Sequence, residues 1–367
     1  MNFEVDFLPV GEGEKNGDAI VVRYGEPGRY TIMVYDGGTQ AAGNALVEHV
    51  KHHYRTDYVD HVVNSHPDMD HASGLSVVLE ELRVGTLWLH RPWQYSHLIV
   101  DYFKDGRITN ASLKDRLQNK LSGAYNLEAL AIKKKITIAE PFQETKIGAF
   151  HVLSPDRDWY VHDLIADFEK TPDARKIATR PLVVQDSGRR SFITEAKKAV
   201  IKWVAERWDL ELLREDVETS AENESSAILC AYMKDHKYGI LLTGDAGLLA
   251  LNKAVDYLER FNVSAPNSIN LIQMPHHGGR HNVSTTVLDR LVGRRLPTIP
   301  QTFSKWSIAS AGAGSAYPRH MVRNAFMRRG AKPYGTKGGT VRFSRGMPDR
   351  GWKDAESLGF SDSVESW

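Results

Sequence analysis

The sequence predicts an α/β fold, in which strands alternate with helices and carry metal-binding side chains at their ends. Two stretches support this class, one at the front of the chain and one after residue 220. In both, short apolar or alternating runs are separated by longer segments whose apolar residues recur at helical spacing. A third observation concerns function: side chains that could ligate a metal follow directly after three of the expected strands.

The first 90 residues are predicted to form strands with interleaved helices. The glycine-rich stretch at residues 11–17 lacks the Lys-Ser/Thr ending of a phosphate-binding loop, so we expect it to join two strands. Ser73 is a candidate N-cap for the second helix. The expected strands cover residues 3–10, 18–24, 30–38, 58–65 and 86–90, and the expected helices residues 42–54 and 74–84.

Residues 91–219 differ, because long helical patterns dominate them. The patterns at residues 113–134 and 193–215 surround a strand pair near residues 135–140 and 150–155. Trp203 and Trp208 would lie on the second helix, in the core of this insertion. The chain therefore divides into a hydrolase-like core at residues 1–90 and 220–345, a largely helical insertion at 91–219 that covers or flanks the cleft, and a loose acidic tail at 346–367.

The chain after residue 220 returns to the mixed pattern. Residues 225–233 and 238–245 should form a hairpin, with Cys230 buried and inert on its first strand. Helical patterns follow at residues 247–261, 285–292 and 319–330, and strand patterns at 268–279 and 339–344.

Bulk composition is that of an ordinary soluble protein. Of the 367 residues, 41% are hydrophobic and 25% are charged. No run approaches the roughly 18 apolar residues of a membrane span, and the first residues do not resemble a signal peptide. Cys230 is the only cysteine, which excludes an intramolecular disulfide. We expect a cytoplasmic protein without a membrane partner.

The stretch SHPDMDHASG, residues 65–74, crowds four possible metal ligands into six positions: His66, Asp68, Asp70 and His71. In an extended loop, side chains at i and i+2 point the same way, so His66, Asp68 and Asp70 can converge. His71 would turn away as the helix begins. Imidazole and carboxylate groups together suit Zn²⁺, Mn²⁺ or Fe²⁺.

Two later strands end in further donors. Asp245 ends ILLTGD, and His276 and His277 end LIQMPHHGG. All three donor groups follow apolar strands, so they could gather at one edge of a sheet sandwich.

These motifs resemble a known family. SHPDMDHASG, LLTGD and PHHGG, in this order, look like the metallo-β-lactamase fold, as does Asp36 in YDGG. Asp68 stands where the usual first motif has its second histidine, and this variant resembles the hydrolase domain of the DNA-uptake channel ComEC/Rec2. The resemblance covers roughly residues 1–90 and 220–345. It implies a four-layered αβ/βα sandwich, with two mixed sheets face to face, helices outside and metals at one edge.

The resemblance also implies six ligands for one or two divalent ions, Zn or Mn, and no other cofactor. His66 and Asp68 would hold one ion, Asp70, His71 and His277 the other, and Asp245 would bridge them.

Other residues would act around the ions. Asp36 would orient the site by hydrogen bonds, and Asn223 could replace a family histidine that has no clear counterpart here. Asp70 is a candidate catalytic residue as well as a ligand, together with His276, which is either a weaker ligand or a proton donor. His320 could contact substrate or donate a proton, or could simply begin a helix. Asp18, which follows the glycine-rich loop, could lie near the site.

Positive charge is concentrated towards the end of the chain. Residues 278–353 hold 15 lysine and arginine residues and two acidic ones, whereas the whole chain carries a net charge of +1. Such a block is typical of a polyanion-binding surface or of a solvated basic face. Lys337, in a glycine turn, and Arg342 are candidates for binding phosphate groups.

The motifs and the charge together predict metal-assisted hydrolysis, in which a bound cation lowers the pKa of water and stabilises the developing charge. The first hypothesis is a phosphodiesterase, specifically a nuclease acting on nucleic acid. The alternative is a hydrolase of a small ester, lactone or phosphoester with the insertion as lid. A third is a metal-stabilised binding module without activity. An open basic groove would favour the first, and a closed apolar pocket the second.

Overall fold

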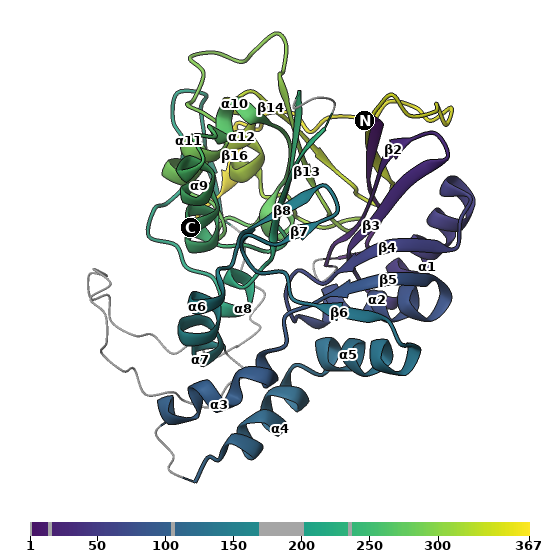
Figure 1. Ribbon diagram of the computed structural model, residues 1–367. Coiled ribbons are helices and arrows are strands. Elements are labelled where there is room, and N and C mark those ends of the chain that lie inside the picture. Colours follow the sequence, from purple (N-terminus) through teal and green to yellow (C-terminus); the bar gives the residue numbers. More distant parts are fainter. Residues whose placement is uncertain (1, 14–16, 104–106, 169–201, 234–236) are drawn as a thin grey trace.

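The computed structural model describes residues 2–13, 17–103, 107–168, 202–233 and 237–367. Two seven-stranded sheets face each other and helices cover their outer faces (Figure 1). The predicted four-layered αβ/βα sandwich is confirmed. None of the helices in the described ranges has both the length and the apolar character that crossing a membrane requires.

Both sheets mix parallel and antiparallel pairs. In spatial order, the first contains β15 (Val341–Arg345), β1 (Asn2–Phe7), β2 (Ala19–Glu26), β3 (Arg29–Gly37), β4 (Tyr58–Val63), β5 (Arg83–Trp88) and β6 (Thr137–Ala139). The second contains β14 (Ala331–Gly335), β13 (Lys305–Ala309), β12 (Ile269–Gln273), β11 (Tyr238–Leu242), β10 (Ile228–Met233), β8 (Phe150–Ser154) and β7 (Lys146–Ile147). A separate two-stranded sheet pairs β9 (Trp203–Ala205) with β16 (Ser363–Glu365).

The helices fall into three groups. Next to the first sheet lie α1 (Gln40–His49), which continues as a π-helix over Val50–Tyr54, α2 (Met69–Glu81) and α5 (Ser122–Lys134), with α3 (Ser96–Ile99) and α4 (Asn110–Lys120) further out. The second sheet is covered by α9 (Leu248–Arg260), α10 (Ala265–Ser268), α11 (Thr285–Leu291) and α12 (His320–Arg328). The short helices α6 (Arg157–Trp159), α7 (Ile165–Asp167) and α8 (Ala221–Glu224) complete the set.

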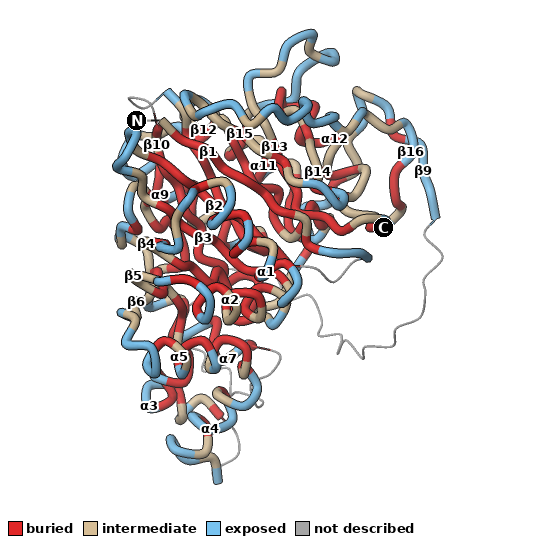
Figure 2. The backbone as a smooth tube through the Cα atoms, turned by 90° about the vertical axis from the view of Figure 1, so that its right-hand side faces the viewer, coloured by how far each residue is buried: buried red, intermediate tan, exposed pale blue. Residues whose placement is uncertain are grey.

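Four layers meet at three interfaces, and the hydrophobic core accordingly has three parts: one between the two sheets and one between each sheet and its helices. The strands are buried along most of their length (Figure 2). Strand β2 shows how the period of two divides its side chains: Ile20 and Val22 pack between the sheets, while Val21 packs against the helices. All three are fully buried. Burying one such side chain stabilises the fold by roughly 1.5–3 kcal/mol.

Helix α2 begins earlier than the sequence suggested. Asp68 occupies the N-cap position, although its side chain makes no capping hydrogen bond, and Asp70 and His71 already lie in the first turn. Ser73 is therefore not the cap; its hydroxyl lies inside the helix and donates to the carbonyl of Gly38. Carboxylates are favourable at a helix N-terminus because the unpaired backbone N–H groups there carry partial positive charge, which explains why the acidic motif itself starts the helix.

The region 91–219 is not a single helical insertion. Strand β6 completes the first sheet, and β7 and β8 complete the second, so these residues belong to the sandwich. Helices α3 to α5 do lie outside the sheets. The helix expected at residues 193–215 is wrong in its described part, because Trp203 lies in β9 and is about half exposed. Trp208 packs against Phe360 and not in the core of an insertion. Residues 193–201 lie outside the described ranges.

The end of the chain is not a loose tail. Strand β16 is hydrogen-bonded to β9, and Val364 and Glu365 are buried. Further upstream, Arg350 forms ion pairs with Glu4 and Asp6 of β1. These contacts join residues more than 150 positions apart, which a local reading of an acidic sequence does not reveal.

Candidate metal centre

Strand ends from both sheets bring the predicted donors together. Asp36 is the second-to-last residue of β3, and the 65–74 motif follows β4, its parallel neighbour. Asp245 follows β11, and His277 follows β12, which is again parallel to its neighbour. The carboxyl ends of adjacent parallel strands meet at the same sheet edge, so the topology itself gathers these side chains.

Four of the predicted ligands, His66, His71, Asp245 and His277, contribute donor atoms to one cluster. The Nε2 atoms of His66 and His71 lie 3.9 Å and 3.5 Å from Oδ2 of Asp245. One ligand atom each of His71, Asp245 and His277 lies within 4.8 Å of the others. Asp68 Oδ2 is 3.7 Å from His66 Nε2. Two imidazoles and a carboxylate at this spacing can share one divalent ion.

Several of these atoms are buried and have no hydrogen-bond partner within the described residues. They are His66 Nε2, His71 Nε2, His277 Nδ1, Asp245 Oδ1 and both carboxylate oxygens of Asp18. An unsatisfied buried polar atom costs about 1–3 kcal/mol, and this many around one point is unusual. A divalent cation would satisfy them together, so the residues fit a metal of the Zn²⁺ or Mn²⁺ type.

Asp36 orients the two histidines of the first motif. Its Oδ1 accepts from the backbone N–H of Ser65 at 2.7 Å, and its Oδ2 accepts from the Ser65 hydroxyl at 2.5 Å and from His71 Nδ1 at 2.9 Å. Because the Ser65 hydroxyl donates to Asp36, it can accept from His66 Nδ1, 2.9 Å away. Both imidazoles therefore carry their proton on Nδ1 and keep the Nε2 lone pair for a ligand. Asp36 itself has its oxygens occupied, which fits an orienting role better than ligation.

Asp18 is a donor that the sequence motifs did not identify as a ligand. It immediately precedes β2, is fully buried, and lies 3.9 Å from both His71 Nδ1 and His277 Nδ1. Burial raises its pKa to about 7 although the nearby His71 opposes the shift. Its position depends on the glycine-rich loop, since a Cβ at Gly17 would lie 1.7 Å from the carbonyl oxygen of Asp70.

When no cation is present, a protonated histidine balances the negative charge of the buried carboxylates. Burial lowers the pKa of His71, but Asp245 and Asp36 raise it more, so it ends well above its usual value. Burial lowers the pKa of His277 to about 4. A cation in the centre would replace the proton on His71 as the partner of the carboxylates.

The PHHG turn is strained and exposes one of its histidines. His276 and His277 both have left-handed backbones, with φ of 47° and 59°, which is uncommon for residues with a side chain. His276 Nδ1 lies 2.5 Å from Asp245 Oδ2 and 3.2 Å from the side-chain nitrogen of Asn223. About a third of the His276 side chain is exposed, whereas His277 is buried. Strain of this kind is typical of functional sites.

The remaining predicted residues near the centre are Asp70 and Asn223. Asp70 is half-buried in the first turn of α2, and its charge raises the pKa of His277, so it lies within electrostatic reach of that histidine. Asn223, on α8, donates to Thr219 and lies beside His276, at the edge of the centre.

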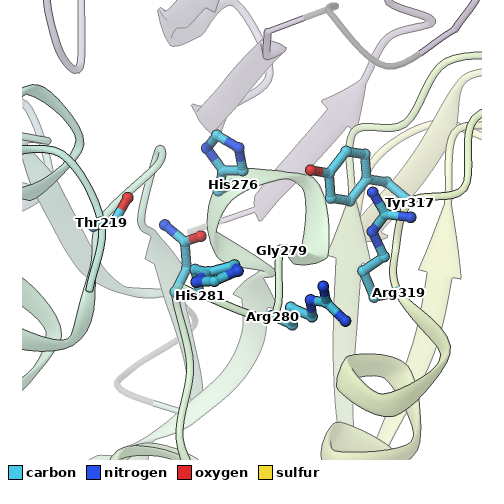
Figure 3. Close-up of a pocket in the computed structure, with 8 residues that line it drawn as sticks. Thr219, His276, Gly279, Arg280, His281, Tyr317 and Arg319 are labelled. Carbon is cyan, nitrogen blue, oxygen red and sulfur yellow. The ribbon is translucent and has the colours of Figure 1, made fainter. Parts of the chain in front are cut away.

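A cavity of about 290 Å³ lies next to His276 (Figure 3). Its lining includes Thr219, Arg280, His281, Tyr317 and Arg319. Sequence reasoning missed Tyr317, whose ring centroid lies 6.1 Å and 6.0 Å from those of His276 and His277. The only signal was its position in the small-residue stretch before His320.

The structure places three predicted site residues in other contacts. His320 Nδ1 donates to the carbonyl of Ser363, and its ring packs on Trp203. Lys337 donates to the carbonyl of Ser315. Arg342 forms an ion pair with Glu4 at 2.6 Å, in a buried network on β1. These contacts leave Arg342 unavailable to phosphate and give His320 a structural partner.

Much of the basic block is neutralised within the fold. Five of its arginines form ion pairs with carboxylates, all but one of which lie outside the block: Arg290, Arg328, Arg329, Arg342 and Arg350. The excess of positive charge counted along the sequence is therefore considerably larger than the charge available to an external polyanion.

One comparison with known proteins, the family model, agrees with the fold. The family model of the metallo-beta-lactamase superfamily matches residues 13–138. No curated protein matches the chain significantly. Among solved structures, unliganded yeast PDE1 shares 11% identity and a TM-score of 0.42, over 92% of this chain and 98% of its own.

Two further structures are similar over parts of their length. A beta-lactamase domain protein from Burkholderia ambifaria shares 13% identity, with a TM-score of 0.32 over 72% of this chain and 64% of its own. A long form RNase Z from yeast shares 11% identity, with a TM-score of 0.34 over 93% of this chain and 42% of its own. All three TM-scores are below 0.5, so none of these structures indicates an activity for this chain.

Proposed function

Because this chain contains a metallo-beta-lactamase superfamily domain, we propose that it is a metal-dependent hydrolase of phosphodiesters. The observation that supports this most strongly is a set of buried donor atoms that have no hydrogen-bond partner among the described residues and lie beside a cavity lined by two arginines. Imidazole and carboxylate donors suit a hydrolytic ion, and guanidinium groups suit a phosphate. The ComEC/Rec2-like variant of the family stays a prediction.

The proposed ligands are those of the motifs, with one addition. His66, His71, Asp245 and His277 would provide the buried donors, the half-buried Asp68 and Asp70 would add carboxylates, and Asp18 would supply a further one. When bound, one or two ions would lower the pKa of water and stabilise negative charge on the phosphate.

Side chains of the protein would orient the ligands and donate the proton to the leaving group. Asp36 and Ser65 hold the tautomers of His66 and His71. His276 lies between Asp245 and the cavity, where it can donate a proton to the leaving oxygen as the phosphorus–oxygen bond breaks. We no longer assign that role to His320, because its ring contacts Trp203.

Nucleic acid is our first candidate substrate, since it is the commonest phosphodiester and the chain retains exposed basic residues such as Arg294 and Arg295. A small phosphoester is the second candidate, because the cavity of about 290 Å³ is compact and five arginines of the block, among them Arg328 and Arg342, are paired internally. We propose that helices α3 to α5 form a flanking unit that provides no ligand.

A parallel assay tests the reaction class. The full chain, loaded in turn with Mn²⁺, Zn²⁺ and Mg²⁺, would be given bis(p-nitrophenyl) phosphate, p-nitrophenyl acetate and single- and double-stranded oligonucleotides. We expect phosphodiester cleavage that is lost in His71→Ala. Acetate cleavage without phosphodiester cleavage would contradict the proposal.

Salt-titrated binding then separates the two substrates. A nucleic acid held through three or four phosphates would show a log–log slope of roughly −2 to −4 against salt. A small phosphoester would show almost none.

A further inference from the structure

The two histidines of the PHHG turn, Pro275–Gly278, have different tasks in the proposed reaction, although they are neighbours in the chain. His277 is buried, with its Nδ1 3.9 Å from Asp18, whereas about a third of the His276 side chain is exposed beside the cavity. Both backbones are left-handed, with φ of 47° and 59°. Residues with a side chain keep such conformations only where the surrounding structure holds them. The groups that hold this turn therefore also decide where its two imidazoles lie.

The chain just before α12 packs directly against this turn. The backbone N–H of Arg319 donates to the carbonyl of Gly278 at 3.1 Å. A Cβ added to Gly278 would lie 2.3 Å from Cβ of Pro318, so this close approach requires glycine. At the other end of the turn, the N–H of His276 donates to the carbonyl of Gly244 at 3.1 Å. These contacts fix both ends of the turn but not the directions of the two imidazole rings.

The ring of Tyr317 lies against both imidazoles. Its centroid is 6.1 Å from that of His276 and 6.0 Å from that of His277, with interplanar angles of 80° and 68°. Edge-to-face packing is a preferred arrangement of aromatic rings at these separations. Figure 3 shows the tyrosine beside His276, where it forms part of the lining of the cavity. One side chain thus contacts both the histidine assigned to the metal and the histidine assigned to the leaving group.

Tyr317 is itself fixed by its surroundings. Its backbone N–H donates to Oγ of the buried Ser315 at 3.0 Å, and the Ser315 carbonyl accepts from Nζ of Lys337 at 2.7 Å. The guanidinium of Arg319 lies over the Tyr317 ring, 4.5 Å from its centroid, which is a favourable cation–π distance. Lys337, which the sequence suggested as a phosphate-binding residue, therefore belongs to the support of this ring.

We propose that Tyr317 is a positioning residue, whose ring keeps His277 at the metal centre and His276 at the cavity. The inference rests on the proposed function, which gives the two histidines their tasks. The contacts with both imidazoles are made by the ring, so the ring and not the hydroxyl carries the role. Tyr317→Phe should preserve it. Tyr317→Leu, which keeps apolar bulk without an aromatic ring, should let the strained turn relax and both imidazoles move.

Labelling of histidines with diethyl pyrocarbonate tests these positions without relying on activity. The full chain, free of metal, would be labelled alongside Tyr317→Phe, Tyr317→Leu and Tyr257→Leu, and the rate at His277 read by mass spectrometry of its peptides. Tyr257 is a matched control, because its ring lies edge-on to Phe261 on α9, with centroids 5.1 Å apart. We expect the buried His277 to react about tenfold faster in Tyr317→Leu and at the wild-type rate in the other two variants. Wild-type protection of His277 in folded Tyr317→Leu would overturn the proposal.

A milder variant keeps the test informative should Tyr317→Leu not fold. Ser315→Ala removes the acceptor of the Tyr317 N–H and leaves the ring in place. Labelling of His277 should then rise by a smaller factor, about two- to threefold. An unchanged rate in Ser315→Ala, beside a Tyr317→Leu protein that is unfolded, would count against the support that we describe.

Metal binding connects the position of the turn with the centre. His277 is a proposed ligand, so Tyr317→Leu should bind Co²⁺ about tenfold more weakly in a titration followed by visible absorption, as expected when a group behind a ligand is lost. Tyr317→Phe should restore the wild-type affinity. Equal Co²⁺ affinity in wild type and Tyr317→Leu would contradict the role at His277.

Kinetics with two leaving groups test the role at His276. For thymidylyl-thymidine, whose leaving alkoxide needs a proton, kcat should fall about tenfold or more in Tyr317→Leu with KM nearly unchanged. For bis(p-nitrophenyl) phosphate, whose leaving group needs none, the loss should be smaller, and Tyr317→Phe should restore both. Equal losses on the two substrates would contradict the role at His276, and a Tyr317→Phe protein as slow as Tyr317→Leu would show that the hydroxyl acts instead of the ring. If the wild type cleaves neither compound but the labelling and Co²⁺ results hold, the proposed function fails and the positioning role stands.

Discussion

Replacing Asp36 by asparagine should damage metal binding while leaving the fold intact. The backbone at this position is left-handed, with φ of 56°, a conformation that asparagine tolerates well. Asparagine can still accept from the Ser65 N–H. Its NH₂ group, however, would face the Ser65 hydroxyl and His71 Nδ1, which both need an acceptor there. His71 would then move its proton to Nε2, the atom that faces Asp245.

The size of the effect follows from the number of anchors lost. Loss of a hydrogen-bond partner behind a ligand commonly reduces metal affinity about 10–100-fold, or roughly 1.4–2.7 kcal/mol. Asp36→Asn disturbs the anchors of both His66 and His71 and should lie at the upper end. Ser65→Ala removes only the anchor of His66, and should lie at the lower end.

Competition with a chromophoric chelator would measure these affinities. Asp60→Asn is a matched control, because Asp60 also accepts a backbone N–H in the same sheet, from Ile32 at 2.8 Å, and is not among the centre's donors. Circular dichroism and melting curves would establish that all variants are folded. Wild-type metal affinity in folded Asp36→Asn would refute the reasoning about tautomers.

Three further predictions follow from other parts of the molecule. Asp70→Ala and His71→Ala should abolish phosphodiester cleavage with little change in melting temperature; wild-type turnover in either would contradict their assignment as ligands. Burial lowers the pKa of His90 to about 3, below its unfolded value near 6.5, so its stability contribution is complete above about pH 6.5 and is lost as the pH falls. Urea denaturation should therefore show His90→Phe losing less stability than wild type between pH 6 and 4, by up to about 1.4 kcal/mol per pH unit; parallel curves would refute this. Arg328 is fully buried and donates to three carbonyls of residues 207–210, so Arg328→Ala should destabilise the fold by about 3–5 kcal/mol, whereas exposed Arg294→Ala should change it by less than about 0.5 kcal/mol; similar melting temperatures for the two variants would contradict this.

The sequence predicted most of the sandwich because its strands follow the period of two and its helices the period of 3.6. The hairpin of β10 and β11 lies where expected. Strands β13 and β14 were missed, and β14 illustrates why. It contains Pro333, which argues against a central strand but is tolerated here, because β14 is at the edge of the second sheet.

The candidate site, too, was predictable from the sequence only in part. Donors that directly follow strands, such as His66, Asp245 and His277, could be found from local motifs. The roles of basic residues could not, since they depend on partners distant in sequence: Glu4, which neutralises Arg342, is 338 positions away. The arginine that faces the cavity, Arg280, is held by Ser366 and Trp367, and no local pattern links these residues.

The most direct test of the account is elemental analysis of the purified chain after reconstitution with Zn²⁺ or Mn²⁺ and removal of excess ion, alongside the double variant His71→Ala/His277→Ala. The account predicts stoichiometric metal in the wild type and a large loss in the variant, because both side chains have buried nitrogens without a hydrogen-bond partner in the described structure. Only trace metal in the folded wild type, or equal metal in both proteins, would contradict it.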